Sequence, residues 1–312
     1  MYASALGIVA MLFISRIPYK FWMQLSTLAY FVALVLCTAV IFVGTSAKGQ
    51  SRWLRIGPIK FQPSEIAKIA VIIFLATIIY KTPKRIGEIM SLLKIMLLIS
   101  PVLAVVAYNN LSTAIIILGI AVCMLFVASP KYLQFILMGI GVCLFGALFI
   151  LLASYRAERV MIWLHPEDYE KGYQTLQGLY AIGSGGFFGK GLGNSAQKRI
   201  IPEVQNDMIL SVICEELGIF GAIVVLILFV MLLYRLLFIA QNAPDLYGSL
   251  IVTGIFAHIA LQVVLNVAVV TNTIPNTGIT LPFISYGGTS ILFLMAEIGI
   301  ALGVSGKIEL EE

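Results

Sequence analysis

Charged residues are scarce in this chain of 312 residues, where Asp, Glu, Lys and Arg together make up only 11% of the composition. Soluble domains carry about a quarter charged residues, so the composition excludes a soluble globular protein. The same shortage excludes a disordered chain, which depends on charge to stay solvated. Because 60% of the residues are hydrophobic and the mean hydropathy is +1.02, a polytopic membrane protein remains.

Cysteine and histidine are scarce as well. The cysteines stand singly in apolar segments, at Cys37, Cys123, Cys143 and Cys214. This spacing excludes a disulfide-stapled module and favours small helix-packing residues. The two histidines, His165 and His258, lie far apart in the sequence, so no histidine-rich metal site is visible. The sequence therefore predicts no metal centre and leaves the identity of any cofactor, including a divalent cation, open.

Long charge-free intervals indicate the membrane crossings. A helix needs about 20 mostly apolar residues to cross the hydrocarbon core, and no charge lies between Lys20 and Lys48 or between Asp245 and Glu297. Placing crossings between the polar positions predicts nine helices, at residues 2–15, 24–44, 63–80, 90–107, 111–128, 132–154, 207–234, 246–270 and 286–306. We therefore predict an all-α, polytopic integral membrane helix bundle with a single domain over residues 1–312 and one large loop at 155–206.

Many basic residues gather in the loops of one face. If the crossings alternate, residues 45–62, 108–110, 155–206 and 271–285 share this face. The basic residues of the whole chain split almost evenly between the two faces, so the positive-inside rule does not orient the protein. Cations retained here suggest an anionic ligand, with plain solvated charge as the alternative. They are Lys48, Arg52, Arg55 and Lys60 in one loop, and Arg156, Arg159, Lys171, Lys190, Lys198 and Arg199 in another.

The large loop contains a glycine-rich run, with six glycines between Gly183 and Gly193. Glycine allows tight backbone turns, so a close-packed turn is one interpretation. The spacing matches neither a dinucleotide-binding loop nor a P-loop. A set of backbone amides that faces a diphosphate is the other interpretation.

Carboxylates follow this run at the mouth of an apolar helix. If that helix begins near Pro202, Glu203 and Asp207 share a face at four-residue spacing. Like charges there would raise one pKa and produce a proton acceptor, whereas the alternative is a helix-start carboxylate that stabilises the macrodipole. Glu216 lies about 180° around the same helix from Asp207, so those two cannot form a local pair.

Two further segments combine polar residues with broken backbone. In residues 49–68, Trp53 is typical of an anchor at the membrane interface, and a helix that begins at Pro63 and Ser64 would pair Glu65 with Lys68 one turn later. An ion pair within a crossing needs polar neighbours. Residues 276–290 are interrupted by glycine and proline near membrane depth, which is tolerated only where protein or a cavity covers the backbone.

Four strings in this chain resemble the SEDS family (shape, elongation, division and sporulation), the FtsW/RodA peptidoglycan glycosyltransferases. The strings are Phe61 to Lys68 (FQPSEIAK), Gly185 to Gln197, Pro202 to Gly218 with its EELG end, and Pro275 to Gly288 (PNTG to PFISYGG). They occur in the family's order and at its spacing. The last string and the NLST string at residues 110–113 are closer to the FtsW branch than to RodA, so the FtsW-like branch is favoured.

The resemblance implies a ten-helix protein whose first helix is missing from this chain, so that the nine predicted crossings become helices two to ten. The short first segment, which no basic region precedes, agrees with a chain that begins inside a larger fold. The loop-rich motif face would then lie outside the bacterial cytoplasmic membrane. The family commonly has a Pro-Asp pair ahead of helix six, whereas this chain has Asn109 and Asn110, so the role of that acid in relatives does not transfer here.

The resemblance also implies an activity and a set of partners. The activity is polymerisation of lipid II into undecaprenyl diphosphate-linked glycan. The implied partners are a class B penicillin-binding transpeptidase and other division or elongation proteins, and no nucleic acid is expected to bind. Asp207 would be the essential acidic residue. Substrate-binding roles fall to Arg52, Trp53, Lys60, Lys198, Arg199, Glu203, Ser285 and Gly287, and structural roles to Glu65, Lys68 and Glu216.

The predicted mechanism needs one base and a cationic clamp for the leaving group. Asp207 would accept the proton of an acceptor hydroxyl, while basic loop residues offset charge on the departing diphosphate. One alternative is a lipid II flippase, which predicts polar residues through the midplane, where this sequence is largely bare of charge. The other alternative is a scaffold that only docks the transpeptidase, which leaves the Asp207 region without a role.

Overall fold

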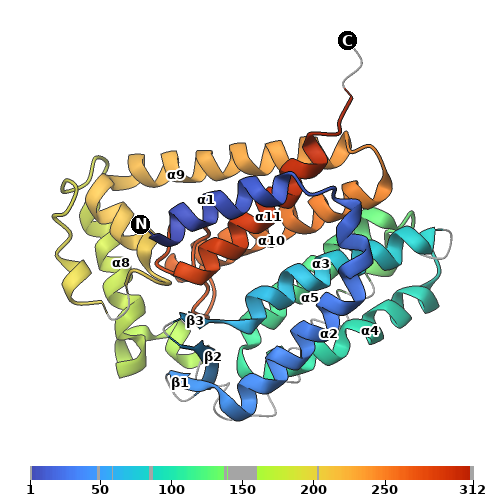
Figure 1. The fold of residues 1–312 in the computed structure, drawn as a ribbon. Helices are drawn as coiled ribbons and strands as arrows, with labels where there is room; N and C mark the ends of the chain where they lie inside the picture. Colours follow the sequence, from blue (N-terminus) through green and yellow to red (C-terminus); the bar gives the residue numbers. More distant parts are fainter. Residues whose placement is uncertain are drawn as a thin grey trace. The chain divides into compact units, whose positions relative to one another are not determined.

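The computed structural model describes residues 2–47, 50–57, 59–83, 87–136, 139, 160–201 and 204–309, and helices dominate it (Figure 1). The long helices are α1 (Tyr2–Ser15), α2 (Lys20–Val43), α3 (Pro63–Lys81), α4 (Ile89–Asn109), α5 (Leu111–Ala128), α8 (Tyr173–Gly185), α9 (Ile209–Gln241), α10 (Leu246–Val270) and α11 (Gly288–Ser305). Three 3-10 turns, η2 (Pro166–Asp168), η3 (Glu170–Gly172) and η4 (Gln197–Arg199), lie between α5 and α9.

Seven of the nine predicted membrane crossings are confirmed in the part of the chain that the structure describes. Within the described ranges, seven helices are long and apolar enough to cross a membrane, namely α2, α3, α4, α5, α9, α10 and α11, and α1 is a shorter apolar helix. The crossing predicted at 132–154 lies almost wholly outside the described residues. Helices satisfy their own backbone groups, which is why long apolar runs fold this way in lipid.

By its internal contacts the chain divides into two compact units. Unit 1 comprises Met1–Tyr132, Leu233–Leu261 and Gly287–Glu312, and unit 2 comprises Leu133–Leu232 and Gln262–Tyr286. Two of the four boundaries between the units fall within helices, at residues 232–233 in α9 and 261–262 in α10. The single domain expected from the sequence stays a prediction, and each unit is described by itself.

Unit 1 is built around α3, the most buried of its crossings. Pro63 stands at the first position of α3, with Glu65 in the first turn and Lys81 in the last, an order that suits the helix dipole. Its middle is fully covered by protein, as at Leu75. Gly254 on α10 allows close approach, because a Cβ there would lie 2.6 Å from Ile72. Elsewhere in the unit, α1 lies beside α11 (Figure 1).

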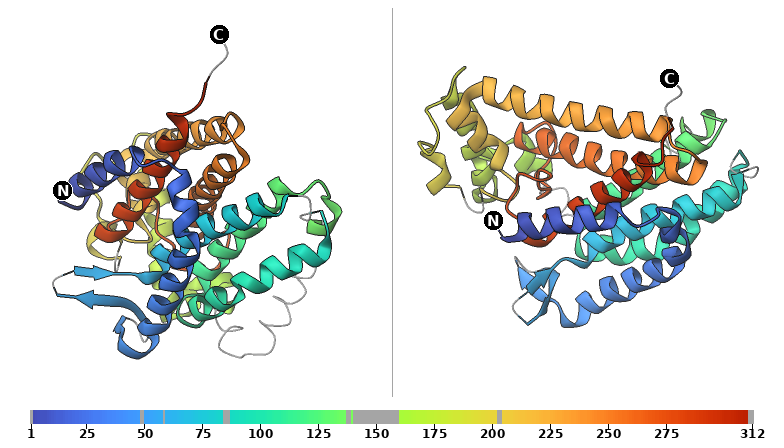
Figure 2. Two further views of the ribbon diagram at one scale, coloured as in Figure 1. Left: turned by 45° about the vertical axis from the view of Figure 1, so that its right-hand side comes forward. Right: turned by 45° about the horizontal axis from the view of Figure 1, so that its top comes forward.

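A small antiparallel sheet, which the sequence analysis did not predict, occupies the loop between α2 and α3. Its strands are β1 (Thr45–Ala47), β2 (Gln50–Ile56) and β3 (Ile59–Phe61), in the order β1-β2-β3. Gly57, at φ 60°, begins the turn between β2 and β3. That turn lacks the Asn-Gly or Asp-Gly pair that usually reveals a hairpin in sequence. The β2–β3 hairpin extends away from the helices of unit 1 (Figure 2).

Candidate active site

Asp207 lies in a turn just before α9, because that helix begins at Ile209. α9 therefore begins later than the possible start near Pro202, so Asp207 lies outside the helix on which a shared face with Glu203 depended. A helix that began earlier would need the backbone carbonyl of Gln205 for its own hydrogen bonds. This carbonyl instead accepts a hydrogen bond of 2.7 Å from Tyr286 N. Glu203 itself lies outside the described residues.

The Asp207 side chain is buried, with 8% of the residue exposed. Its Oδ1 accepts a hydrogen bond of 3.1 Å from Nε2 of Gln174 on α8. Its backbone carbonyl accepts one of 2.9 Å from Nδ2 of Asn266 on α10. A Cβ on Gly278 would lie 3.8 Å from Asp207 Oδ2, so the loop after α10 passes close to this carboxylate. The site thus gathers an acid and two neutral amides from segments that are far apart in sequence.

The segment between α10 and α11 is non-helical, in accordance with its glycine and proline content. Two side-chain amides of α10 hold it: Asn266 Nδ2 donates to Ile279 O at 2.7 Å, and Gln262 Nε2 donates to Thr280 O at 3.0 Å. The buried Ser285 closes a turn of its own, because its Oγ accepts from Leu281 N at 2.7 Å. A substrate-binding role for Ser285 would have to compete with this hydrogen bond.

The glycine-rich loop fills a break in α9, which is kinked at Gly218 (φ 70°, ψ −173°). Such a break frees backbone groups that must find partners at membrane depth. A Cβ on Gly218 would collide with the carbonyl oxygen of Phe187, and one on Gly189 with that of Glu216. Four hydrogen bonds of 2.9 to 3.1 Å join the two backbones: Lys190 N to Glu215 O, Gly191 N to Glu216 O, Ile219 N to Gly186 O and Phe220 N to Phe187 O.

These bonds decide between the two interpretations of the glycine-rich run. The amides of Lys190 and Gly191 are already bound to carbonyls of α9, and Gly189 N donates to Gly185 O at 2.9 Å. These three amides are therefore not available to cradle a diphosphate. The loop is a close-packed turn whose glycines permit backbone-to-backbone contact.

Glu215 is a buried residue of this region to which the sequence analysis gave no role. Its carboxylate is fully buried and accepts hydrogen bonds from Lys190 Nζ at 2.7 Å, from Ser184 Oγ at 3.3 Å, and from Ser195 Oγ. Gln197 N adds a further bond of 3.2 Å. The signal in the sequence was the adjacent pair of carboxylates, Glu215 and Glu216, in an apolar helix. Burying such carboxylates is costly unless each one has hydrogen-bond or charged partners. Glu215 ties the glycine-rich loop and η4 to α9.

Lys198 lies on η4 at the edge of a groove in unit 2. Its side chain is 57% exposed, and Nζ is 3.9 Å from Oε1 of Glu216. Arg199 follows on the same turn, and its side chain lies outside the described part of the chain. The groove therefore combines one cation with branched apolar side chains. Its lining is Lys198, Ile201, Val204, Gln205, Ile209 and Val212.

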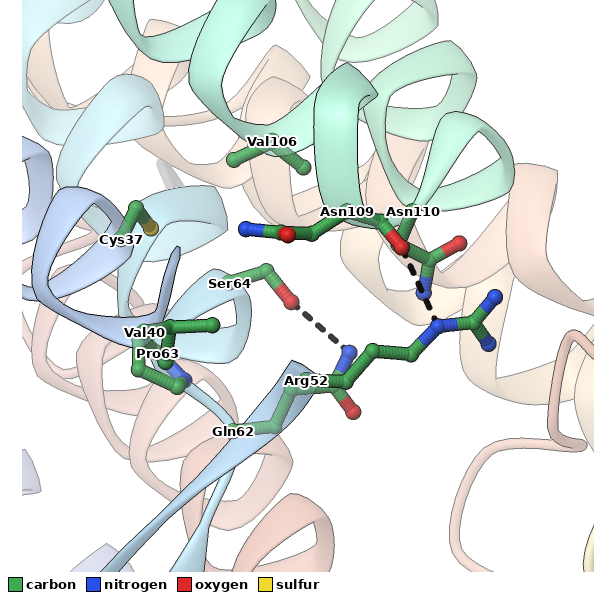
Figure 3. Close-up of a pocket in the computed structure, with 9 residues that line it drawn as sticks. All are labelled: Cys37, Val40, Arg52, Gln62, Pro63, Ser64, Val106, Asn109 and Asn110. Atoms are coloured by element: carbon green, nitrogen blue, oxygen red, sulfur yellow. Dashed lines mark hydrogen bonds between the residues drawn. The ribbon is translucent and has the colours of Figure 1, made fainter. Parts of the chain in front are cut away.

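Arg52 lines a small pocket in unit 1, shown in Figure 3. Its Nε donates to Asn109 O at 3.2 Å. Asn110 caps α5, because its Oδ1 accepts from Thr113 N at 3.3 Å. Amide and hydroxyl groups face apolar side chains across this pocket, whose full lining is Cys37, Val40, Arg52, Gln62, Pro63, Ser64, Val106, Asn109 and Asn110.

The other predicted residues of unit 1 lie on the sheet and on α3. Trp53 is half-buried on β2, whereas Lys60 is exposed on β3. Lys68 Nζ lies 2.9 Å from Glu65 Oε1, with 2% and 10% of the side chains exposed, so this crossing contains the buried ion pair that the spacing predicted. Gly287 precedes α11 in extended backbone.

The structure thus divides the predicted residues between the two units. Unit 2 holds Asp207, Lys198, Arg199, Glu216 and Ser285, and unit 1 holds Arg52, Trp53, Lys60, Glu65, Lys68 and Gly287. Within unit 2, potential ligand atoms of His165, Glu167 and Asp168 lie within 4.8 Å of one another, which sequence reasoning did not predict. All three side chains are exposed, and exposed acidic groups of this kind are common without an ion.

The fold and the site define a multi-pass membrane protein with a buried carboxylate just before a crossing helix. Residues 1–309 match the family model of the FtsW, RodA and SpoVE proteins, described as cell cycle proteins, and the chain belongs to this family. This confirms the resemblance that the four sequence strings indicated.

Individual proteins agree with this assignment. The stage V sporulation protein E of Bacillus subtilis is 39% identical over 97% of this chain and 84% of its own length. A probable peptidoglycan glycosyltransferase FtsW of Trichlorobacter lovleyi is 36% identical over 97% of this chain and 82% of its own length. A solved structure, described as a peptidoglycan synthase complex that coordinates polymerization and crosslinking, contains a chain with a TM-score of 0.83 and 28% identity, covering 97% of this chain and 87% of that one.

Proposed function

We propose that this chain is a peptidoglycan glycosyltransferase that polymerises lipid II, acting at the outer face of a bacterial cytoplasmic membrane with a class B penicillin-binding transpeptidase as its partner. The observation that carries the proposal is the buried Asp207 carboxylate just before a crossing helix, which accepts a hydrogen bond from Gln174. The name of the FtsW relative and the described complex support the same activity. The FtsW relatives agree with a role in division, and elongation and sporulation are the alternatives.

Asp207 is suited to accept a proton in this reaction. The 4-hydroxyl of an acceptor sugar attacks the anomeric carbon of the growing strand, its proton passes to Asp207, and the bond from that carbon to the diphosphate oxygen breaks. The diphosphate departs with the bonding electron pair, and nearby cations offset its charge. Lys198 is the cation at the groove in unit 2, whose apolar lining suits the first units of a polyprenyl chain.

The decisive experiment incubates the purified chain and its transpeptidase with lipid II and resolves the glycan products on a gel. Asp207→Asn keeps the shape of the side chain but not the base, so polymerisation should fall by about 10²–10⁴-fold while the melting temperature and partner binding persist. Asp168→Asn, an exposed acid in the same unit, is the matched control and should retain activity. An active Asp207→Asn enzyme would exclude the base assignment.

The same assay separates the alternative functions. A flippase or a scaffold would yield no glycan from the wild-type chain, with or without the transpeptidase. We expect polymerisation to decrease when the transpeptidase is omitted. An equal rate from the isolated chain would count against an obligate activating complex.

The leaving-group clamp has its own test. Lys198→Gln should raise the KM for lipid II with little change in melting temperature, because an exposed cation contributes little to stability. Arg199→Gln is the neighbouring control. Equal, small effects at both positions would favour the alternative interpretation, in which Lys198 and Arg199 are solvated surface charges that bind no substrate.

A further inference from the structure

Three phenylalanine rings form an exposed cluster where the glycine-rich loop meets α9. Phe187 and Phe188 come from the loop and Phe220 comes from α9, and their ring centroids lie 4.9, 6.4 and 6.5 Å apart. We call these three residues the phenylalanine cluster. Each of them is more than half exposed, and Phe188 is 77% exposed. An exposed apolar patch of this kind marks a surface that lipid or another protein covers.

The phenylalanine cluster continues the exposed apolar side of a crossing helix. α9 is among the helices that are long and apolar enough to cross a membrane. Before its break at Gly218 the helix is mostly buried, as at Val212 and Cys214. After the break, large apolar residues such as Ile219 and Val230 are exposed. The exposed apolar side of a helix that crosses a membrane faces lipid, so the phenylalanine cluster borders a lipid-facing surface.

The length of α9 places the phenylalanine cluster at one edge of the hydrocarbon core. No charged residue lies between Glu216 and Arg235, and this stretch is about 27 Å long at a helical rise of about 1.5 Å per residue. That length is close to the thickness of the core, about 30 Å. Phe220 therefore lies near the boundary of the core, and so do the two loop residues whose rings lie beside it. In Figure 1, the segment between α8 and α9 lies at one end of α9.

The loop neutralises the groups that would oppose contact with lipid. Lys190 is the only charged residue in the run from Gly183 to Gln197, and its ammonium group pairs with the buried Glu215 at 2.7 Å. The backbone amides of residues 189–191 donate to backbone carbonyls at 2.9 Å. Charges and backbone groups without partners are costly in lipid. Because these groups have partners here, the loop can carry its phenylalanines against the acyl chains.

We propose that the phenylalanine cluster is a lipid anchor whose occupant is the bilayer leaflet next to it. Phe187 and Phe188 lie among the upper parts of the acyl chains, where an interfacial apolar face is buried by about 5–10 Å. The anchor fixes the glycine-rich loop at the membrane surface. It also fixes η4, because Gln197 N of that turn donates to the same Glu215 carboxylate that Lys190 binds. This contact with lipid does not depend on the proposed enzymatic activity.

Tryptophan fluorescence tests the anchor in nanodiscs that hold one copy of the chain. Phe188→Trp adds an emission that is measured as the difference from the wild-type chain, which already has Trp22, Trp53 and Trp163. Bromine quenches tryptophan only at close range. We therefore expect phospholipids brominated on their acyl chains to remove about half of the added emission, because the anchor lies within about 10 Å of the headgroups. Iodide in the water should leave the added emission almost unchanged.

Glu167→Trp is the matched control in the same unit. Glu167 is on η2 with 58% of its side chain exposed, and it lies beside the exposed His165 and Asp168. A tryptophan at this charged surface should respond in the opposite way, with quenching by iodide and none by brominated lipid.

A second measurement uses the wild-type chain, so it does not depend on the folding of a variant. Hydroxyl radicals produced in water oxidise the aromatic side chains that water reaches. In the same nanodiscs, Phe187 and Phe188 should stay unmodified while the exposed His165 is oxidised. Mass spectrometry of the digested chain reads out both positions.

The outcomes of these measurements are distinct. Quenching by brominated lipid both with and without the bound transpeptidase would support the anchor. Quenching by iodide alone, together with oxidation of Phe187 and Phe188, would show that the phenylalanine cluster faces water and would overturn the proposal. Quenching by brominated lipid that disappears when the transpeptidase binds would assign this surface to that partner and would also overturn it.

Discussion

Lys190 and Glu215 form an ion pair in which one partner is solvated and the other is not. Nζ of Lys190 lies 2.7 Å from Oε1 of Glu215, with 39% of the lysine side chain exposed and none of the glutamate side chain. Because Ser184 and Ser195 donate to the same carboxylate, its burial is compensated by several donors rather than by one charge. This carboxylate holds the glycine-rich loop against α9.

Glu215→Gln should therefore destabilise the protein markedly. The amide keeps the shape, but its NH2 group would face donors, so we expect a loss of about 2–3 kcal/mol in unfolding free energy. Thermal unfolding of the purified complex measures this. Glu216→Gln is the control, since Lys198 lies 3.9 Å away and is exposed, and its effect should stay within about 0.5 kcal/mol. Equal losses at both positions would contradict the assignment of Glu215 as the central residue of the network.

Gly218→Ala should be among the most damaging small substitutions in unit 2. Gly218 has φ 70°, and its missing Cβ makes room for the Phe187 carbonyl, so strain and collision add to an expected cost of about 2–5 kcal/mol. Gly193→Ala is the matched control, because Gly193 also has a positive φ, 81°, but nothing within 4 Å of a Cβ. Its cost should be only about 1–2 kcal/mol. Comparable melting temperatures for the two variants would show that the close backbone approach at the kink does not contribute to stability.

Lys60→Glu should stabilise the hairpin while impairing substrate use. Arg55 and Lys60 are direct partners in the ladder between β2 and β3, and like charges at such a position are destabilising. An opposite-charge pair contributes about 0.2–1 kcal/mol, so the melting temperature should rise. If Lys60 binds the substrate, as the family resemblance implies, the KM for lipid II should rise as well. Lys60→Gln should fall between wild type and Lys60→Glu, and a glutamate variant with unchanged KM would remove Lys60 from the site.

Asp245 should make stability depend on pH in the acid range. Burial raises the pKa of its carboxyl, but hydrogen bonds from Gly248 N, the Lys20 ammonium and the Tyr19 hydroxyl outweigh burial and lower the pKa below its ordinary value of 3.8. A lowered pKa stabilises the fold above the ordinary value, and this contribution is lost as pH falls from about 3.9 through the folded-state pKa. Melting temperatures between about pH 2.5 and 6 should show this loss in the wild type. In Asp245→Asn the loss should be smaller by the contribution of this carboxylate, and identical pH profiles would refute the argument.

The membrane crossings could be predicted because they depend on local composition. A charge-free run of sufficient length is a property of neighbouring residues, and the hydrocarbon core imposes the same length on every crossing. The pair of Glu65 and Lys68 is equally local, since three-residue spacing on a helix brings side chains together. Each of the four family strings is also a continuous stretch of sequence, so it can be recognised without the fold.

The environment of Asp207 could not be predicted in this way. Its partner Gln174 lies 33 positions away and Asn266 lies 59 positions away. The sequence also left open an earlier start of α9 near Pro202, but the tertiary bond from Tyr286 N to Gln205 O uses a carbonyl that such a helical turn would need. The β2–β3 hairpin was missed because its turn carries a Gly-Pro sequence in place of the usual hairpin signal.

The sequence by itself thus determined that the chain crosses a membrane repeatedly, where most crossings lie and which family it resembles, because hydropathy and motif spacing act over short stretches. Only the tertiary structure decided which groups surround the acid, which carboxylate of the Glu215 and Glu216 pair is satisfied by the glycine-rich loop, and that the glycines of this loop serve a helix break. Hydrogen-bond partners for buried polar groups come from wherever the fold brings a donor within about 3 Å, and spacing along the chain does not encode that distance.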